Sequence, residues 1–190
     1  MARYLTFSGS RREASFNTAV INIVSRELTT SNQQVTAISL KDFELPLYEQ
    51  PTEQQLGLPE QATDLRNLFK HHDGVIIGCP EYNGILPPLL LNTLTWISRS
   101  SEGQPDLSVF QGKPVLITSC SPGSLGGIRA AAHLKSFLSG VGCVVFPEMI
   151  IVANAFSAFD PSGNLADENL SRKTVTTIQQ FHQLTSKISA

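Results

Sequence analysis

Residues 74–79 read Gly-Val-Ile-Ile-Gly-Cys, a run without a charged or strongly polar side chain. A strand that is covered on both faces is apolar throughout, whereas a strand with one face in water alternates apolar and polar residues. Residues 113–119, Lys-Pro-Val-Leu-Ile-Thr-Ser, have a similar apolar centre. We therefore expect both segments to be inner strands of a parallel sheet that carries helices on its two faces.

Around these two runs, short apolar segments alternate with longer segments of helical period. Residues 42–57 are polar, carry two prolines and are expected to form a loop. Five β-α units in strict alternation predict an α/β three-layer sandwich, whose five-stranded parallel sheet has the order 2-1-3-4-5. The expected strands are residues 4–7, 35–40, 74–79, 113–119 and 143–152, and the expected helices are residues 15–28, 60–71, 86–98, 125–138 and 170–188.

The composition is that of an ordinary globular protein. The 190 residues, 41% hydrophobic and 16% charged, suit a single domain over residues 1–190. A net charge of −2 gives no basic excess for nucleic acid or an anionic membrane. We expect no membrane span and no signal peptide. The three cysteines, without a C-x-x-C pair, predict free thiols in a reducing cytoplasm, and neither disulfides nor a metal site.

A ligand of such a sheet binds beyond the carboxyl ends of the strands, at the point where the strand order reverses. For the order 2-1-3-4-5, that point lies between the first and the third strand. The loops that follow Phe7, Cys79 and Ser119 converge there. The sequence therefore predicts that these three loops form the binding site.

The first loop, residues 8–17, combines three serines, two arginines and an asparagine at a predicted helix start. The N–H groups and the dipole of a helix N-terminus attract anions, and arginines there are unfavourable by about 0.3–1 kcal/mol each unless an anion compensates. The loop lacks the glycine patterns of dinucleotide and triphosphate sites, so a monophosphate fits better. The alternative is a plain helix cap, in which Ser10 and Glu13 form a capping box and the arginines are solvated.

The second loop, residues 80–87, reads Pro-Glu-Tyr-Asn-Gly-Ile-Leu-Pro. Tyr82 and Asn83 could give a flat ring system a stacking surface and in-plane hydrogen bonds. Equally, Asn83 and Gly84 could be ordinary turn residues. The third loop, residues 119–127, has three serines and three glycines, which let a backbone approach a ligand closely. Its alternative is a solvent-exposed loop.

Two of these loops carry the motifs of a known family. Residues 9–17, Gly-Ser-Arg-Arg-Glu-Ala-Ser-Phe-Asn, match its motif G-S-x-R-x-x-S-x-N, and residues 80–87 match P-E-Y-N-x-x-x-P. Over nearly its whole length the chain resembles the NADPH-dependent FMN reductase family, flavodoxin-like enzymes that include chromate and quinone reductases and are similar to some azoreductases. The resemblance implies an oxidoreductase that transfers hydride from NADPH or NADH to FMN, and on to a small acceptor such as a flavin, a quinone, an azo compound or chromate.

The resemblance also implies roles for the three loops. The first would hold the FMN phosphate, the second would line the isoalloxazine ring, and the third would cover the other edge of the ring. The flavin carries the chemistry, so no catalytic acid or base is assigned. The expected cofactor-binding residues are Ser10, Arg12, Ser15 and Asn17 for the phosphate, together with Phe16, Pro80, Glu81, Tyr82, Asn83, Gly84, Ser119, Ser121, Gly123 and Gly126.

The chain departs from the family pattern next to the second loop. The family usually has a small polar residue, often Ser, in place of Ile85, and it has Gly and Lys where this chain has Pro88 and Leu91. An acidic residue is frequent near the position of Thr95. These differences make the entrance of the site more apolar, and they bear on nicotinamide preference and natural acceptor more than on flavin binding.

The segment from Leu86 to Ile97 is too apolar for a helix that buries a single stripe. Leu89, Leu90 and Leu91 alone cover about 200° around the helix axis, so a second face of the helix needs cover. A second copy of the chain would provide it, and the family resemblance implies dimers or tetramers. We expect a homodimer or homotetramer through this helix; the alternative is cover by the chain's own loops.

Two other functions are compatible with the sequence. A flavodoxin-type electron carrier would bind FMN without oxidising NAD(P)H. Such carriers usually present a strongly acidic face, and the net charge of −2 argues mildly against one. A regulatory or scaffolding α/β domain would bind no flavin at all.

Overall fold

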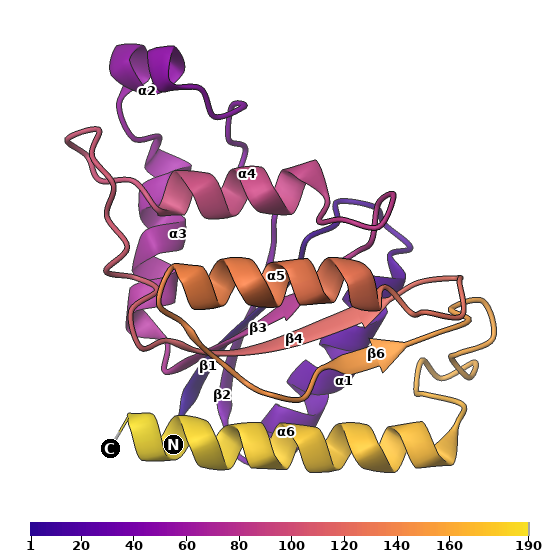
Figure 1. Cartoon of the computed structure of the whole chain (residues 1–190). Coiled ribbons are helices and arrows are strands. Elements are labelled where there is room, and N and C mark those ends of the chain that lie inside the picture. Colours follow the sequence, from indigo (N-terminus) through magenta and orange to yellow (C-terminus); the bar gives the residue numbers. More distant parts are fainter. Residues whose placement is uncertain (190) are drawn as a thin grey trace.

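The sheet lies at the centre of the structure, with helices on both sides of it (Figure 1). The computed structural model describes residues 1–189. Parallel strands follow one another in the order β2-β1-β3-β4-β5, and β6 also pairs with β4. The predicted α/β fold and strand order are confirmed. The strands are β1 (Arg3–Ser8), β2 (Gln34–Ser39), β3 (Gly74–Gly78), β4 (Pro114–Cys120), β5 (Val144–Val145) and β6 (Ile150–Val152).

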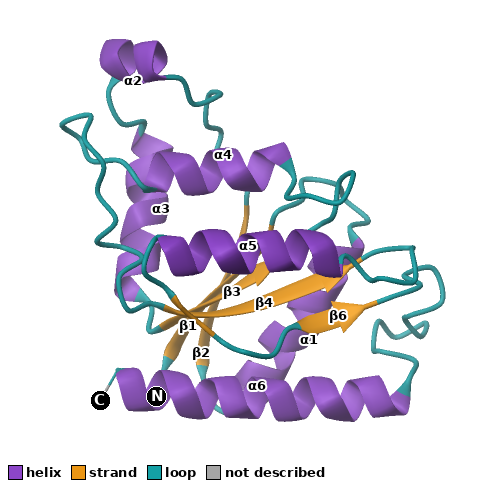
Figure 2. Ribbon diagram, in the orientation of Figure 1, coloured by secondary structure: helices purple, strands orange, loops and turns teal. Residues whose placement is uncertain are grey.

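Each face of the sheet is covered by its own set of helices (Figure 2). Apolar residues of α1 and α6 pack on one face, and those of α3, α4 and α5 pack on the other. Within residues 1–189, no helix has both the length and the apolar character that a membrane crossing requires. The helices are α1 (Phe16–Thr30), α2 (Gln50–Leu56), α3 (Glu60–His71), α4 (Pro88–Ile97), α5 (Ile128–Gly140) and α6 (Glu168–Ile188).

The two inner strands are buried along their whole length, as their sequences predict. In β3, Val75 and Ile77 pack with α3, α4 and α5, whereas Ile76 packs with α1 and α6. Both faces of the strand therefore need apolar side chains, which explains the unbroken apolar run. Since β2 lies beyond β1 and all later strands lie beyond β3, the strand order reverses between β1 and β3.

The last part of the sheet differs from the prediction of one strand over residues 143–152. The chain forms two short strands there: β5 pairs with the beginning of β4, and β6 pairs with its end. Pro147 lies between them, and proline cannot donate a hydrogen bond to a strand ladder. The chain leaves the sheet at this point and returns to it, so the sheet has six strands instead of five.

The loop predicted over residues 42–57 contains the helix α2, so that prediction is wrong for residues 50–56. The carboxylate of Glu53, whose side chain is 2% exposed, accepts hydrogen bonds from Arg99 Nε (2.7 Å) and Nη2 (2.9 Å). The hydroxyl of Tyr48 donates a third at 3.0 Å. A seven-residue helix is marginal by itself, and contacts with a segment distant in the sequence stabilise it here.

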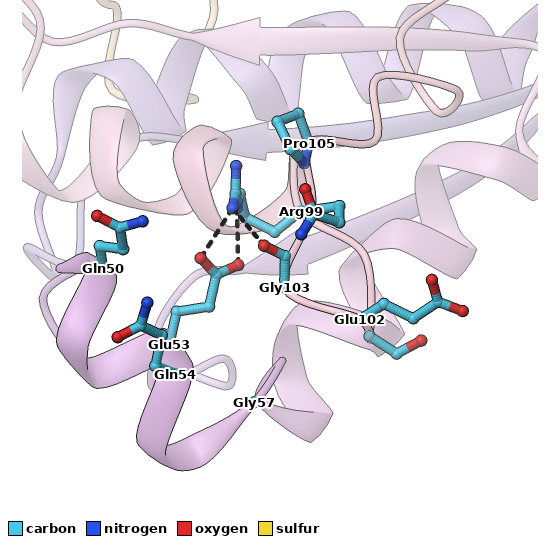
Figure 3. A pocket seen from close by; sticks show the side chains of 10 residues that line it. Gln50, Glu53, Gln54, Gly57, Arg99, Glu102, Gly103 and Pro105 are labelled. Atoms are coloured by element: carbon cyan, nitrogen blue, oxygen red, sulfur yellow. Dashed lines mark hydrogen bonds and ion pairs between the residues drawn. The ribbon is translucent and has the colours of Figure 1, made fainter.

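A cavity of about 630 Å³ lies between α2 and residues 99–105 (Figure 3). Arg99 reaches across one side of it, where it contacts Glu53 and also donates to the carbonyl oxygen of Gly103 at 2.8 Å. None of the residues that line this cavity belongs to the three loops singled out by the sequence. We therefore assign it a structural role as the place where α2 attaches to the domain.

Candidate functional site

The loops that follow β1, β3 and β4 meet at the carboxyl ends of the strands, where the strand order reverses. They enclose a cleft of about 300 Å³. Nine of the fourteen residues expected at the site line this cleft. The lining consists of Ser10, Arg12, Ser15, Phe16, Asn17, Pro80, Glu81, Tyr82 and Ser121, all of them expected, together with Cys120, Pro122 and Phe156.

Ser15 begins helix α1 as its N-cap. Its hydroxyl accepts a hydrogen bond from the N–H of Thr18 at 3.4 Å. The first N–H groups of a helix have no partner within the helix and carry its positive dipole end. Ser10 does not cap the helix, since its hydroxyl accepts a bond from the N–H of Arg12 at 3.2 Å. The capping box of Ser10 and Glu13 is therefore wrong, because the N-cap of α1 is Ser15, five residues after Ser10.

The two neighbouring arginines of the first loop have different surroundings. Arg11 turns away from the cleft and donates to the carbonyl oxygens of Leu40 (3.0 Å) and Phe43 (3.2 Å). Arg12 lines the cleft, with its guanidinium carbon 5.1 Å from the centre of the Phe16 ring. Of these two arginines, Arg12 is thus the one in position to contact an anion at the start of α1.

Asn17 joins α1 to the end of β4. Its amide nitrogen donates to the carbonyl oxygen of Cys120 at 2.9 Å, and its amide oxygen accepts from the N–H of Cys120 at 3.0 Å. The side chain is 4% exposed. Both polar atoms already have partners, so Asn17 fixes the first loop against the third and has a reduced capacity to bind a phosphate.

The second loop forms a tight turn. Tyr82 and Ile85 exchange two backbone hydrogen bonds of 3.1 Å. Asn83 and Gly84 between them have φ values of 53° and 84°, which asparagine and glycine adopt more readily than other residues. The turn leaves the Tyr82 side chain half exposed at the cleft, whereas Asn83 and Gly84 do not line it. The structure thus shows Asn83 and Gly84 as turn residues.

Glu81 anchors the second loop to the start of α5. Its carboxylate accepts hydrogen bonds from both Nε (3.0 Å) and Nη2 of Arg129, and from the N–H of Ala130 at 3.3 Å. The hydrogen bond from Arg129 is the main reason why the pKa of Glu81 lies below its ordinary value. An ionised Glu81 therefore also offsets the positive end of the α5 dipole.

Most of the expected residues of the third loop do not line the cleft. The hydroxyl of Ser119 is fully buried and donates to the carbonyl oxygen of Cys79 at 2.6 Å. Like Ser119, Gly123 and Gly126 do not line the cleft, and only Ser121 of the expected residues in this loop does. Burial raises the pKa of Cys120, at the beginning of the loop, to about 12, so its thiol stays protonated and unreactive at neutral pH.

Four residues of the site are not among those expected from the sequence. Cys120 and Pro122 flank Ser121 and could have been included as its neighbours. Arg129 carries no motif, and its role depends on a contact across 48 positions of the sequence. Phe156 belongs to the segment after β6, which the sequence did not connect with the three loops. No local pattern points to either of the last two residues.

A parallel sheet of this order, with a cleft at the carboxyl ends of the strands where the order reverses between β1 and β3, defines the flavodoxin-like class of α/β proteins. Residues 2–157 match the family described as NADPH-dependent FMN reductase, and the chain belongs to this family. The family uses FMN, with NAD(P)H as the electron donor, and its members are oxidoreductases. The family, activity and cofactor expected from the sequence are confirmed.

Several relatives support this assignment. An NADH:(hydroxy)cinnamate reductase subunit of Vibrio ruber is 30% identical over 98% of this chain and 88% of its own length. A quinone reductase of Escherichia coli strain K12 is 36% identical over 70% of this chain and 68% of its own. The solved structure of FerB, a flavoenzyme NAD(P)H:(acceptor) oxidoreductase of Paracoccus denitrificans, has a TM-score of 0.81 at 25% identity, with 98% of each chain covered.

Proposed function

We propose that the cleft between β1 and β3 binds FMN, with the phosphate at the start of α1 and the flavin ring against Tyr82. The observation that carries this proposal is that two different kinds of side chain line the cleft. Hydroxyl and guanidinium donors of Ser10, Arg12 and Ser15 stand next to the first turn of α1, whereas the second loop presents a half-exposed aromatic ring. A phosphate needs the first environment, and a flat ring system suits the second.

The residues of the cleft bind and orient the cofactor and take no part as acids or bases. Arg12 and Ser15 neutralise and hydrogen-bond the phosphate, while the ion pair of Glu81 with Arg129 keeps the second loop in place under the ring. FMN held by these residues would supply the redox chemistry, namely hydride acceptance from NADPH or NADH and electron transfer to an acceptor. Tyr82 is half-exposed, and we expect nicotinamide and acceptor to bind beside it in turn, with ping-pong kinetics.

The proposed acceptor is a small, largely apolar molecule, with quinones preferred. Ile85 is 57% exposed and pairs with Tyr82 across the turn, so it places an aliphatic side chain next to Tyr82. Quinone reductases occur among the relatives that match most of the chain. A flavin, an azo compound or chromate are the other acceptors to test.

The purified protein, loaded with FMN and mixed anaerobically with NADPH or NADH, should rapidly lose its visible flavin absorbance. Addition of a quinone should restore the absorbance. A protein that keeps its flavin oxidised in the presence of both nucleotides would instead be an electron carrier. A protein that takes up no FMN would be neither an FMN-dependent reductase nor an electron carrier.

We also propose that two copies of the chain associate through α4. The chain's own loop covers part of this helix, because Trp96 Nε1 donates to the carbonyl oxygen of Pro46 at 2.7 Å. Leu91 of α4 remains 45% exposed, and Leu47, next to Pro46, is 70% exposed. These side chains form the apolar surface that a second copy would bury.

Light scattering should therefore give a mass of two or four chains of 20.7 kDa at micromolar concentration. Replacement of Leu91 by glutamate should shift the protein towards the monomer. A monomeric wild-type protein at this concentration would contradict the proposed assembly.

The proposed location is the cytoplasm, which agrees with three buried free thiols.

A further inference from the structure

Phe156 is a large apolar side chain that lies at the rim of the FMN cleft and is 83% exposed. Water contact with an aromatic ring is unfavourable, so such exposure next to a binding cleft suggests that a ligand covers the ring. Its ring meets the ring of Phe16 edge-on, with centroids 5.4 Å apart and planes at 90°. Phe156 thus extends the wall of the cleft outward from the start of α1.

The backbone holds Phe156 firmly in this place. Asn154 has a φ of 52° and starts a turn that is closed by a hydrogen bond from the N–H of Ser157 to its carbonyl oxygen, at 2.9 Å. The N–H of Ala155 donates to the carbonyl oxygen of Ser121 at 3.2 Å, and Ala155 is buried. The turn is therefore attached to the third loop of the cleft, and the ring of Phe156 is exposed without being on a free loop.

The neighbours of Phe156 show which end of the cleft it covers. Phe16 directly follows Ser15, and the guanidinium of Arg12 lies over its ring. The ring of Phe159 is stacked nearly parallel to that of Phe16, with an angle of 5° between the planes. Phe16 thus joins Phe156 and Phe159 to the part of the cleft that holds Arg12 and Ser15, whereas Tyr82 belongs to another loop.

We propose that Phe156 covers the ribityl-phosphate end of bound FMN and slows its release. This inference rests on the proposed function, in which the phosphate lies at the start of α1. A ring above the contact between Arg12 and the phosphate excludes water, and an ion pair is stronger when water is excluded. Because Phe156 lies at the phosphate end, it leaves the hydride-transfer region of the cleft open.

The test compares Phe156→Ala with the wild-type protein. FMN binding is followed by the quenching of flavin fluorescence in titrations of the FMN-free protein, at several salt concentrations, and FMN release by dilution. We expect the dissociation constant to rise roughly tenfold, mainly through faster release. FMN binding should also become more sensitive to salt, because the ion pair between Arg12 and the phosphate is more exposed to water and is therefore screened more strongly by salt. The free energy of unfolding should stay unchanged, because the side chain is exposed.

Ile188→Ala, which truncates an aliphatic side chain at the far end of α6, serves as the control and should leave FMN binding unchanged. Unchanged affinity, release and salt dependence in Phe156→Ala would overturn the inference, and so would a change confined to the KM of the acceptor. Arg12→Ala tests the proposed phosphate site independently of the role of Phe156. If it weakens FMN binding while Phe156→Ala does not, the phosphate site stands and only the role of Phe156 is wrong.

Discussion

Replacing Arg12 and Ser15 together by alanine is expected to weaken FMN binding by about two orders of magnitude. A hydrogen bond to a charged group contributes about 1.5–3 kcal/mol, and the double variant removes a guanidinium and a hydroxyl from the proposed phosphate position. A loss of about 3 kcal/mol corresponds to roughly a hundredfold change in the dissociation constant. Fluorescence titration of the FMN-free protein measures this directly.

The neighbouring arginine provides a matched control for that variant. Arg11→Ala removes the same charge one position away, but the guanidinium of Arg11 is bound to the carbonyl oxygens of Leu40 and Phe43. It should change FMN affinity only slightly. Riboflavin, which has no phosphate, should bind the double variant and the wild-type protein equally weakly. An equal effect of Arg11→Ala and Arg12→Ala would mean that net charge alone attracts FMN.

Glu53→Gln is expected to destabilise the domain by about 3 kcal/mol. The carboxylate of Glu53 is buried and paired with Arg99, and removal of one member leaves the other charge in a poorly hydrated place. Denaturant unfolding of the FMN-free protein measures the loss. Glu102→Gln, an exposed residue on the same cavity, should change stability by less than about 0.5 kcal/mol. A loss from Glu53→Gln that is no larger than this would show that the pair does not fix α2.

The same pair predicts how stability depends on pH. The hydrogen bond from Arg99 is the main cause that lowers the pKa of Glu53 in the folded protein. The stabilisation is therefore present above the unfolded pKa of about 4.3 and is lost as the pH falls through the lower folded value. The stability difference between wild type and Glu53→Gln should shrink in acid, since a protonated Glu53 is as neutral as glutamine. A difference that stays constant down to about pH 3 would contradict this.

The fold follows from the sequence wherever burial alone decides the structure. The apolar runs of β3 and β4 and the helical period of residues 60–71 predict elements that the structure shows with the same or nearly the same ends. The prediction fails where the formation of an element depends on a single contact between residues far apart in the sequence. Helix α2 depends on the pair of Glu53 with Arg99, 46 positions apart. The interruption between β5 and β6 depends on Pro147, whose effect inside an apolar run is easily underestimated.

The site is predictable to the extent that it consists of local motifs. The motif residues Ser10, Arg12 and Ser15 and the aromatic Tyr82 all line the cleft. A sequence gives residue types but not the directions of side chains. Ser119 is among the expected cofactor-binding residues, whereas in the structure its hydroxyl points to the carbonyl oxygen of Cys79. Phe156 lies at the cleft because the segment after β6 passes beside it. No motif in the sequence indicates this position.

A crystal structure of the FMN complex tests the central claim most directly. We expect density for the phosphate within hydrogen-bonding distance of the Arg12 guanidinium and the Ser15 hydroxyl, with the flavin ring next to Tyr82. A phosphate bound outside the first loop, for example at the cavity beside α2, would contradict it.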